Sequence, residues 1–236
     1  MSVAETFRLL HRSPRLLVLP NAWDVASAKA FAAIDGCCAI ATTSAGVARS
    51  LGYEDGEGTP VEEMLRVVER IAAAVEVPVT ADLEAGYGDP PRAAAAALAA
   101  GAAGMNLEDS HGEKEMLPLD EQVEIIRATH AAAPELVLNA RVDVFITGTG
   151  GVDEAVERGN AYLAAGADCV YPILAPFEAV GALTAGIGGP VNVAASPLEP
   201  RLDELEALGV KRVSFGPGLA RAALAEATRL VAVALG

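Results

Sequence analysis

Acidic side chains stand at the ends of two apolar runs in this chain, where buried strands would give way to loops. Asp82 and Glu84 follow the run 77–80, and Glu108 follows the run 104–105. Burying an unpaired carboxylate is so costly that such acids need a metal ion, an arginine or hydrogen bonds. Carboxylate oxygens clustered at strand ends are typical of a site for a hard cation. The alternative is that these acids cap helices and face water.

A third strand end adds Asn139, Arg141 and Asp143. Residues two apart on a strand point to the same side, so these three share one face. Arg141 could offer its fork to a carboxylate or to developing negative charge. The alternative for Arg141 is a structural salt bridge to Glu108 or Asp143. Asn192, in a later strand, could add another polar group to the substrate-binding rim.

Oxygen ligands on such a rim suit Mg²⁺, with Mn²⁺ as a second choice. Mg²⁺ keeps several waters and uses few carboxylates, which leaves positions for substrate oxygens. A 2-oxo acid could chelate the ion through its keto and carboxylate oxygens, and the ion would stabilise an enolate during bond cleavage. The pattern therefore predicts metal-assisted chemistry on a small 2-oxo acid.

Eight strand-like runs alternate with eight helical runs along the chain. The predicted strands span 16–20, 39–44, 78–83, 104–108, 136–142, 169–174, 190–195 and 212–216. The predicted helices span 24–34, 60–75, 91–100, 120–132, 152–165, 176–185, 201–208 and 219–235. Strict alternation predicts parallel crossovers and a single (β/α)8 barrel domain over residues 1–236. A doubly wound sheet is the alternative, but it often has a glycine-rich turn after its first strand, and residues 20–24 contain no glycine.

The composition limits the classes of partner. A net charge of −15 argues against nucleic acid and anionic membranes, because both need a basic face. It does not exclude an anionic substrate, since one divalent ion and one arginine can invert the local field. There is no N-terminal basic-plus-apolar signal, and no apolar run has the length of a membrane span without a charge, Gly or Pro. We expect a soluble, cytoplasmic protein.

Several ordered motifs together resemble those of the isocitrate lyase/phosphoenolpyruvate mutase superfamily. They lie at 20–28, 43–48, 50–56, 81–88, 106–110 and 139–143, within a resemblance that runs from about residue 15 to 220. It implies a (β/α)8 barrel that binds Mg²⁺, acts on small 2-oxo or enol acids, and makes or breaks C–C or P–C bonds.

The resemblance also implies roles for individual residues. Asp82 matches the metal-contacting aspartate and also borders the substrate, while Glu84 and Glu108 are expected near the metal through water. Arg141 matches the substrate-binding arginine, and Asp55 matches an aspartate in the loop after the second strand. We expect Arg141, Asp55 and Glu108 to act in catalysis.

The carboxylate of the substrate would be held by Ser44 with the backbone amides of Ala45 and Gly46. Members of the family are commonly tetramers whose last helix packs on a neighbouring subunit. The resemblance therefore implies a homo-oligomer, a dimer or a tetramer, in which helix 219–235 could be swapped. The same helix could instead close its own barrel.

One loop departs from the family. Lyases of this family carry a Lys-x-Cys-Gly-His sequence after the fourth strand, but residues 110–118 contain no cysteine. The lysine–asparagine gate of the phosphonopyruvate enzymes is also not evident. His111 or Lys114 could substitute as an acid or a lid contact, although a solvated loop is the favoured interpretation.

Three functions remain open. The first is a Mg²⁺-dependent lyase that cleaves a C–C bond in a small 2-oxo or 2-hydroxy (di)carboxylic acid, such as an oxaloacetate- or methylisocitrate-like substrate. The second is a mutase or hydrolase of the P–C bond of phosphonopyruvate or phosphoenolpyruvate. The third is a non-catalytic protein that binds 2-oxo acids.

Overall fold

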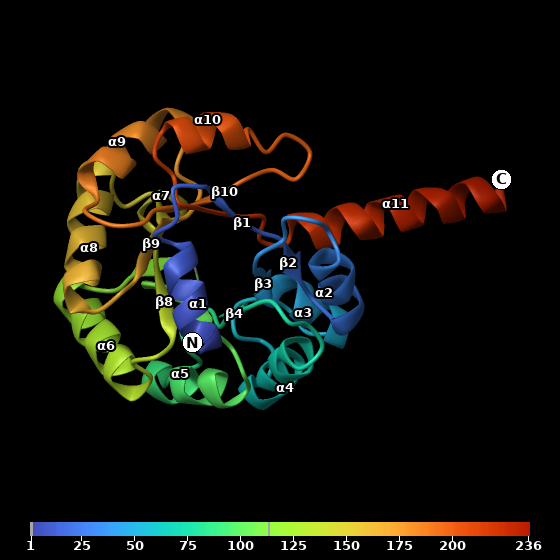
Figure 1. Cartoon of the computed structure of the whole chain (residues 1–236), viewed down its shortest axis with the longest axis horizontal. Helices are drawn as coiled ribbons and strands as arrows, with labels where there is room; N and C mark the ends of the chain where they lie inside the picture. Colours follow the sequence, from blue (N-terminus) through green and yellow to red (C-terminus); the bar gives the residue numbers. More distant parts are fainter. Residues whose placement is uncertain (1, 113) are drawn as a thin grey trace.

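The structure is a computed structural model that describes residues 2–112 and 114–236 (Figure 1). The strands are β1 (Leu17–Leu19), β2 (Asn21–Ala22), β3 (Ile40–Thr42), β4 (Val79–Asp82), β5 (Gly104–Leu107), β6 (Ser110–His111), β7 (Glu115–Met116), β8 (Val137–Val142), β9 (Cys169–Pro172), β10 (Asn192–Ala194) and β11 (Arg212–Ser214). The helices are α1 (Val3–Leu10), α2 (Val25–Ala32), α3 (Ser44–Leu51), α4 (Val61–Ala72), α5 (Pro90–Ala99), α6 (Leu119–Ala132), α7 (Val144–Thr147), α8 (Val152–Ala165), α9 (Val180–Gly186), α10 (Leu202–Ala207) and α11 (Gly218–Leu235), with a 3₁₀ turn at Phe177–Ala179.

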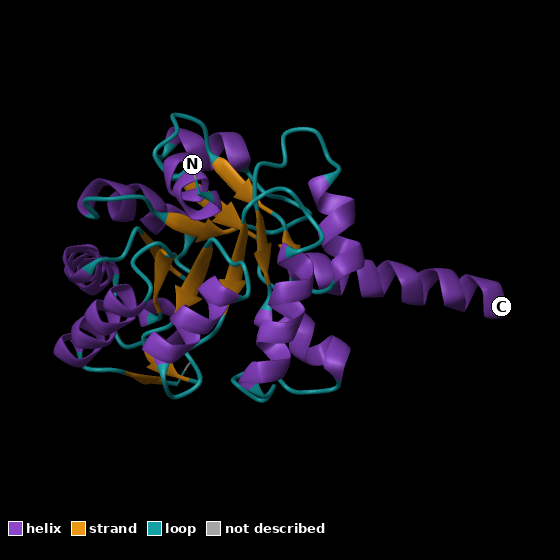
Figure 2. Cartoon of the chain, turned by 60° about the horizontal axis from the view of Figure 1, so that its bottom comes forward, coloured by secondary structure: helices purple, strands orange, loops and turns teal. Residues whose placement is uncertain are grey.

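Two parallel sheets meet to form the barrel. One has the strand order β2-β3-β4-β5-β8-β9, and the other has the order β1-β11-β10. β1 and β2 belong to one extended segment in which only Pro20 separates them. On the opposite side, Val170 of β9 bridges Val191 in parallel and donates its N–H to the carbonyl of Pro190 at 2.9 Å. The strands therefore surround the centre with helices outside, and the predicted (β/α)8 barrel is confirmed (Figure 2).

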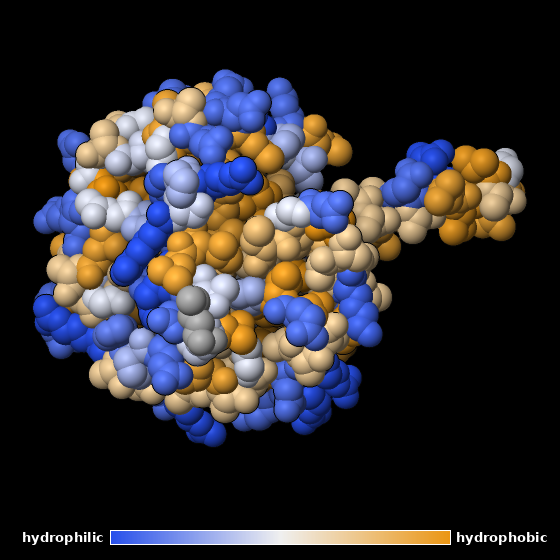
Figure 3. Space-filling model, in the orientation of Figure 1, coloured by the Kyte–Doolittle hydropathy of each residue, from blue (hydrophilic) through white to orange (hydrophobic). Residues whose placement is uncertain are grey.

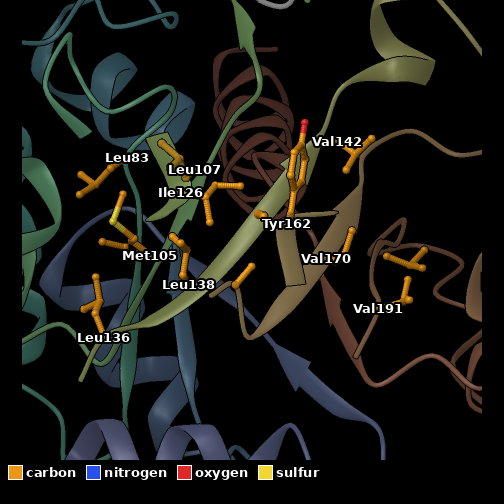
Figure 4. Packing of buried hydrophobic residues seen from close by; sticks show 14 of the residues in the cluster. Leu83, Met105, Leu107, Ile126, Leu136, Leu138, Val142, Tyr162, Val170 and Val191 are labelled. Atoms are coloured by element: carbon orange, nitrogen blue, oxygen red, sulfur yellow. The ribbon is translucent and has the colours of Figure 1, made fainter. Parts of the chain in front are cut away.

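The main hydrophobic core lies between the strands and the outer helices (Figure 4). Leu83, Met105 and Leu138, from the region of β4, β5 and β8, pack with Ile126 of α6 and Tyr162 of α8. Parallel strands that are covered on both faces are apolar along most of their length, which explains the continuous apolar runs in the sequence. The polar exceptions to this pattern lie at the carboxyl ends of the strands.

Helix α1 precedes the first strand, and the sequence analysis does not predict it. Ser2 caps the helix by accepting a hydrogen bond from the N–H of Glu5 at 3.1 Å. Phe7 is completely buried in a cluster with Leu17 of β1 and Val137 of β8, which begin their strands. Helix α1 therefore covers the amino-terminal end of the barrel.

The predicted strand 39–44 is too long at its carboxyl end. β3 stops at Thr42, and Ser44 is already the first residue of α3. The cause is local, because Thr43 caps the helix and its hydroxyl accepts a hydrogen bond from the N–H of Gly46 at 3.4 Å. Ser44 thus enters the site from a helix amino terminus rather than from a strand.

Helix α11 projects from the barrel instead of closing it (Figures 1 and 3). None of its residues is buried. Leu224, Leu230, Val231, Val233 and Leu235 are all more than half exposed. In the part of the chain that the structure describes, no helix is both long enough and apolar enough to span a membrane.

Replacing Phe7 by alanine should destabilise the fold strongly. Deleting a fully buried phenyl ring leaves a cavity and lowers the free energy of unfolding by about 3–5 kcal/mol. Urea denaturation followed by circular dichroism measures this. Leu9→Ala is the matched control on the same helix, because Leu9 is 48% exposed, and it should change the free energy by less than about 1 kcal/mol. Equal effects of the two substitutions would contradict the role of α1 as a barrel cover.

Candidate functional site

Asp82 ends β4 and is held in place from two sides. Its Oδ2 accepts hydrogen bonds from the N–H and the hydroxyl of Ser44, both at 2.9 Å. Its Oδ1 accepts from Nδ2 of Asn106 in β5 at 3.2 Å. All of these donors are neutral groups, and together they fix the orientation of the Asp82 side chain.

Glu84 is held by hydrogen bonds from a neighbouring loop and from Tyr87, which the sequence analysis did not anticipate. Its side chain accepts hydrogen bonds from the N–H of Glu57 at 2.5 Å and from the hydroxyl of Tyr87 at 2.8 Å. The carboxylate of Glu57 in turn accepts from the N–H of Tyr87 at 2.5 Å. Glu57, Glu84 and Tyr87 all have φ between 52° and 63°, a conformation that non-glycine residues rarely adopt. These hydrogen bonds connect the loop that carries Asp55 to the segment that follows β4.

Arg141 is paired with acids on both sides. Its Nε and one terminal nitrogen bind the two oxygens of Asp143 at 2.6 and 2.8 Å. Its other terminal nitrogen forms a salt bridge with Glu108. The structural salt bridges to Glu108 and Asp143, which the sequence left open as the alternative for Arg141, are therefore present. It does not remove Arg141 from the site, because Arg141 and Glu108 both line a cavity.

Behind this pair lies a buried acid that the sequence analysis missed. Asp109 accepts a hydrogen bond from the N–H of Asp143 at 2.8 Å, and from the Tyr162 hydroxyl at 2.6 Å. Arg158 of α8 lies 3.5 Å from the same carboxylate. Ser110 donates to Asp143 at 2.5 Å. The acidic pair after β5 was the available signal, but only the tertiary structure shows that α8 supplies its partners.

Two neighbouring cavities open at this end of the barrel. The acidic cavity, of about 320 Å³, is lined by Ser44, Asp55, Gly56, Glu57, Glu84, Ala85, Glu108, His111, Gly112 and Arg141. The mouth cavity, of about 500 Å³, shares Ser44, Asp55 and Arg141 with it and adds Asp82, Asn106 and Ala45. The structure therefore brings together most of the residues predicted from the sequence.

Two of the predicted substrate-binding residues, Asn192 and Gly46, lie elsewhere, and the two loop candidates His111 and Lys114 differ from each other. Asn192 is completely buried in β10 and donates to Ser214 at 3.5 Å, one layer below Ala194, which lines the mouth cavity. Gly46 lines a groove beside α11 instead of either cavity. His111 reaches the acidic cavity, whereas Lys114 is not among its lining residues.

The barrel interior contains a buried arginine that supports Asp82 indirectly. Arg212 of β11 is fully buried and donates to Oδ1 of Asn106 at 3.2 Å. Its other terminal nitrogen lies 3.4 Å from Nε2 of His11. Nδ1 of His11 lies 2.9 Å from the carbonyl of Phe7 and must donate to it, so Nε2 can accept from Arg212. A chain of hydrogen bonds thus joins α1 to the candidate site.

The electrostatics of the acidic cavity favour a cation. Desolvation of its carboxyl group and then the charge of Asp82 raise the pKa of Asp55. Burial raises the pKa of Glu84 to about 7, and the charges of Asp82 and Asp55 contribute in the same direction. Mutual repulsion between acids is relieved when a cation lies between them.

The donor set fits Mg²⁺ held largely by water. Among the described residues, no group of three or more His, Cys, Asp or Glu side chains is close enough to hold a metal ion. Mg²⁺ commonly uses one or two carboxylates and retains its waters. Asp82 could provide the direct ligand, while Glu84 and Glu108 could accept hydrogen bonds from the waters.

The comparisons with known proteins agree with this geometry. The family model described as phosphoenolpyruvate phosphomutase matches residues 7–235. The chain therefore belongs to this family, within the isocitrate lyase/phosphoenolpyruvate mutase superfamily, and the resemblance drawn from its motifs is confirmed.

Individual relatives cover most of the chain. An uncharacterized protein of Mycobacterium tuberculosis is 37% identical over 214 residues, which are 89% of this chain and 81% of the relative. The 2-methylisocitrate lyase of Bacillus subtilis is 30% identical over 72% of this chain and 59% of that enzyme.

Solved structures share the fold. A protein of Burkholderia cenocepacia, provisionally described as a phosphonomutase, is 40% identical, covers 97% of this chain and 98% of its own, and gives a TM-score of 0.91. A phosphonopyruvate hydrolase in complex with oxalate and Mg²⁺ is 27% identical, covers 98% of this chain and 86% of its own, and gives a TM-score of 0.87.

The buried Asp109 predicts a pH dependence of stability. Burial and the charge of Asp143 raise its pKa to about 6 from a usual value of 3.8. The stabilisation that protonated Asp109 contributes is complete below the pKa that it has in the unfolded chain. It is lost as the pH rises through the pKa that Asp109 has in the folded protein. Between pH 5 and 7 the free energy of unfolding of the wild type should therefore fall by about 1 kcal/mol relative to that of Asp109→Asn. Urea denaturation of both proteins across this range measures the difference. A constant difference would show that Asp109 does not titrate there.

Proposed function

We propose that the chain is a Mg²⁺-dependent enzyme that cleaves a C–C bond in a small 2-oxo or 2-hydroxy acid. The observation that carries the proposal is the placement of Asp82. This carboxylate is fixed by Ser44 and Asn106 at the barrel mouth, and the Arg141–Glu108 pair lines the adjoining acidic cavity. The lyases of this family, such as the B. subtilis relative, support the reaction class.

The first turn of α3 would hold the substrate carboxylate. A helix amino terminus presents free N–H groups and a positive dipole end, which together favour an anion. Ser44 and Ala45 of this turn line the mouth cavity. The N–H and the hydroxyl of Ser44 both donate to Asp82, so the substrate carboxylate would rely on the N–H of Ala45 and on the dipole of the helix.

When bound, Mg²⁺ would act as a Lewis acid that stabilises negative charge on a substrate oxygen. Asp55 would move a proton, since its carboxyl group lines both cavities. Its raised pKa brings it closer to the range in which a carboxylate accepts a proton efficiently. Arg141 would face the developing charge, and Glu108 and Asp143 would fix its orientation.

Cleavage or rearrangement of a P–C bond is the second candidate. The similarity to the phosphonopyruvate hydrolase favours it. The described part of the loop after β5 does not distinguish the two reactions, because it has no cysteine. A non-catalytic binding protein is the third candidate, and the paired acids and arginine argue against it.

Turnover assays separate these candidates. We expect Mg²⁺-supported release of a 2-oxo acid from a panel of 2-hydroxy acids and oxaloacetate, and loss of activity with EDTA. Phosphate release from phosphonopyruvate, or its conversion to phosphoenolpyruvate, would instead establish P–C chemistry. Asp82→Asn keeps the shape of the side chain and should lower turnover about a hundredfold. Asp35→Ala is the control at an exposed acid and should leave turnover unchanged. Full activity of Asp82→Asn would refute the assignment.

We also propose that α11 packs on a neighbouring copy of the chain. Its exposed leucines and valines have no cover in the described chain. An apolar groove of about 820 Å³ lies between the start of α11 and residues such as Trp23 and Arg49. A matching helix from a second copy could fill this groove, as the family resemblance implies.

Light scattering coupled to gel filtration tests this arrangement. The full chain should elute as a dimer or tetramer, whereas Leu230→Asp/Val233→Asp should shift it towards the monomer, because buried charge opposes association. The control Arg229→Asp/Glu226→Arg changes charge on the same helix at two already charged positions and should preserve assembly. A monomeric wild type would exclude the swap.

A further inference from the structure

The proposed cleavage needs a proton donor. When a C–C bond breaks, one carbon keeps the electron pair and must be protonated before the product leaves. Residues 110–118 contain no cysteine, and Lys114 is not among the residues that line either cavity. His111 lines the acidic cavity, but its side chain is exposed. The mouth cavity is therefore the other place where a donor for this carbon can lie.

Tyr171 is the candidate donor in the mouth cavity. Among the described residues that line this cavity there is no histidine, cysteine or lysine, and Tyr171 is the one phenol. It lies near the end of β9, opposite Arg141 of β8 in the parallel register. Residues paired in this way point to the same side of a sheet, and both side chains line the cavity. Tyr171 is only 5% exposed, so its ring is packed inside the barrel.

A hydrogen bond places the hydroxyl of Tyr171 in the barrel interior. Its partner is Ser214 of β11. β10 lies between the two strands, because it pairs with β11, and Val191 just before it bridges β9. The tyrosine side chain therefore reaches past β10 along the inner face of the barrel. Ser214 also lines the mouth cavity, so the two hydroxyl groups meet at its border.

The direction of this hydrogen bond lets Tyr171 donate to a substrate. Ser214 accepts a hydrogen bond from Nδ2 of Asn192 at 3.5 Å. A hydroxyl has one proton, which Ser214 can give to the phenol oxygen. The bond lowers the pKa of Tyr171, as expected when the phenol oxygen is the acceptor. This order of donors leaves the phenolic O–H of Tyr171 to donate into the cavity.

The surroundings of Tyr171 suit a proton donor. Burial raises the pKa of Tyr171 to about 12 from a usual value of 10, and the charge of Asp82 acts in the same direction. The phenol is therefore protonated at neutral pH. The charges of Arg141 and Arg212 act in the opposite direction. They would stabilise the phenolate after the proton has left.

We propose that Tyr171 is a catalytic residue whose phenolic O–H donates a proton to the carbon that keeps the electron pair of the broken C–C bond. The proposal rests on the proposed function, because it takes the cleavage of this bond as the reaction. It assigns to β9 the protonation step for which residues 110–118 offer no cysteine.

The electrons and protons of this step balance. In a 2-hydroxy acid whose neighbouring carbon bears a second carboxylate, Asp55 takes the proton of the hydroxyl group. The electron pair of that O–H bond forms the C=O bond of the 2-oxo acid. The pair of the C–C bond stays on the neighbouring carbon, where the second carboxylate delocalises it, and this carbon takes the proton of Tyr171. Arg221 lines the same cavity and could face the second carboxylate.

Oxaloacetate needs the same donor. Its carboxylate leaves as CO₂, the electron pair of the broken bond passes into the enolate of pyruvate, and the enolate carbon takes the proton of Tyr171. In both reactions the phenolate of Tyr171 regains a proton from water after the products leave. No oxidant or reductant is required.

The configuration of the product tests the proposal. Cleavage of 3-methylmalate in D₂O gives glyoxylate and a propanoate with one deuterium on the carbon that was protonated. With Mg²⁺ the wild type should give one enantiomer, because Tyr171 delivers the deuteron from one side. Tyr171→Phe should lower kcat about a hundredfold or more, and its residual product should be racemic because water replaces the donor. Deuterium NMR of a chiral ester measures the configuration.

Two further variants serve as controls. Tyr53→Phe removes a hydroxyl that binds Glu63 at 3.0 Å and lines neither cavity, so kcat and configuration should not change. His111→Asn tests the alternative donor and should still give one enantiomer. A racemic product from His111→Asn, together with one enantiomer from Tyr171→Phe, would overturn the proposal.

Oxalate binding shows whether Tyr171→Phe keeps an intact site. Oxalate needs no protonation at carbon, so calorimetry in the presence of Mg²⁺ should give equal affinities for the wild type and the variant. Loss of oxalate binding in Tyr171→Phe would also overturn the proposal, because Tyr171 would then serve binding.

The same assays separate a failure of this proposal from a failure of the proposed function. A wild type that cleaves 3-methylmalate or oxaloacetate, together with a fully active Tyr171→Phe, would leave the proposed function standing and refute only the role of Tyr171. Cleavage of neither compound by the wild type would refute both.

Discussion

Keeping several carboxylates close together at the barrel mouth is the constraint on which the rest of the structure depends. Each buried acid needs a donor or a cation, and the chain provides these from elements far apart in sequence. Asp82 uses Ser44 and Asn106, Glu84 uses the loop around Glu57, and Arg141 serves two acids at once. The loops are therefore shaped by the partners that the acids require.

The same constraint explains what the sequence could reveal. Eight alternations of strand and helix are recorded in local patterns, and the barrel places strand ends together by topology alone. The acids after β4 and β5 and Arg141 in β8 were predictable for that reason. Predicting that the ends of β4, β5 and β8 meet at one rim required no knowledge of side-chain contacts.

Other features depend on tertiary contacts that leave little local signal. Glu57 lies in a loop, and nothing near it in sequence indicates that its N–H binds Glu84. The partners of Asp109 come from α8, and the cap at Thr43 is a single hydroxyl. Asn192 was expected at the rim as a polar residue of a late strand, but it lies two residues before Ala194 and is completely buried one layer deeper. Helix α1 is short, and its packing under the barrel adds to the Ser2 cap in stabilising it.

The link from α1 to Asp82 has an evolutionary consequence. His11, Arg212 and Asn106 lie far apart in the sequence and form one connected set in the barrel interior. Losing Arg212 alone would leave His11 and the carbonyl oxygen of the Asn106 side chain with one donor fewer, and would loosen the residue that steadies Asp82. A gradual exchange of one member at a time is thus disfavoured. Among relatives of this protein, these three positions should change together or not at all, even though His11 and Arg212 line neither the acidic cavity nor the mouth cavity.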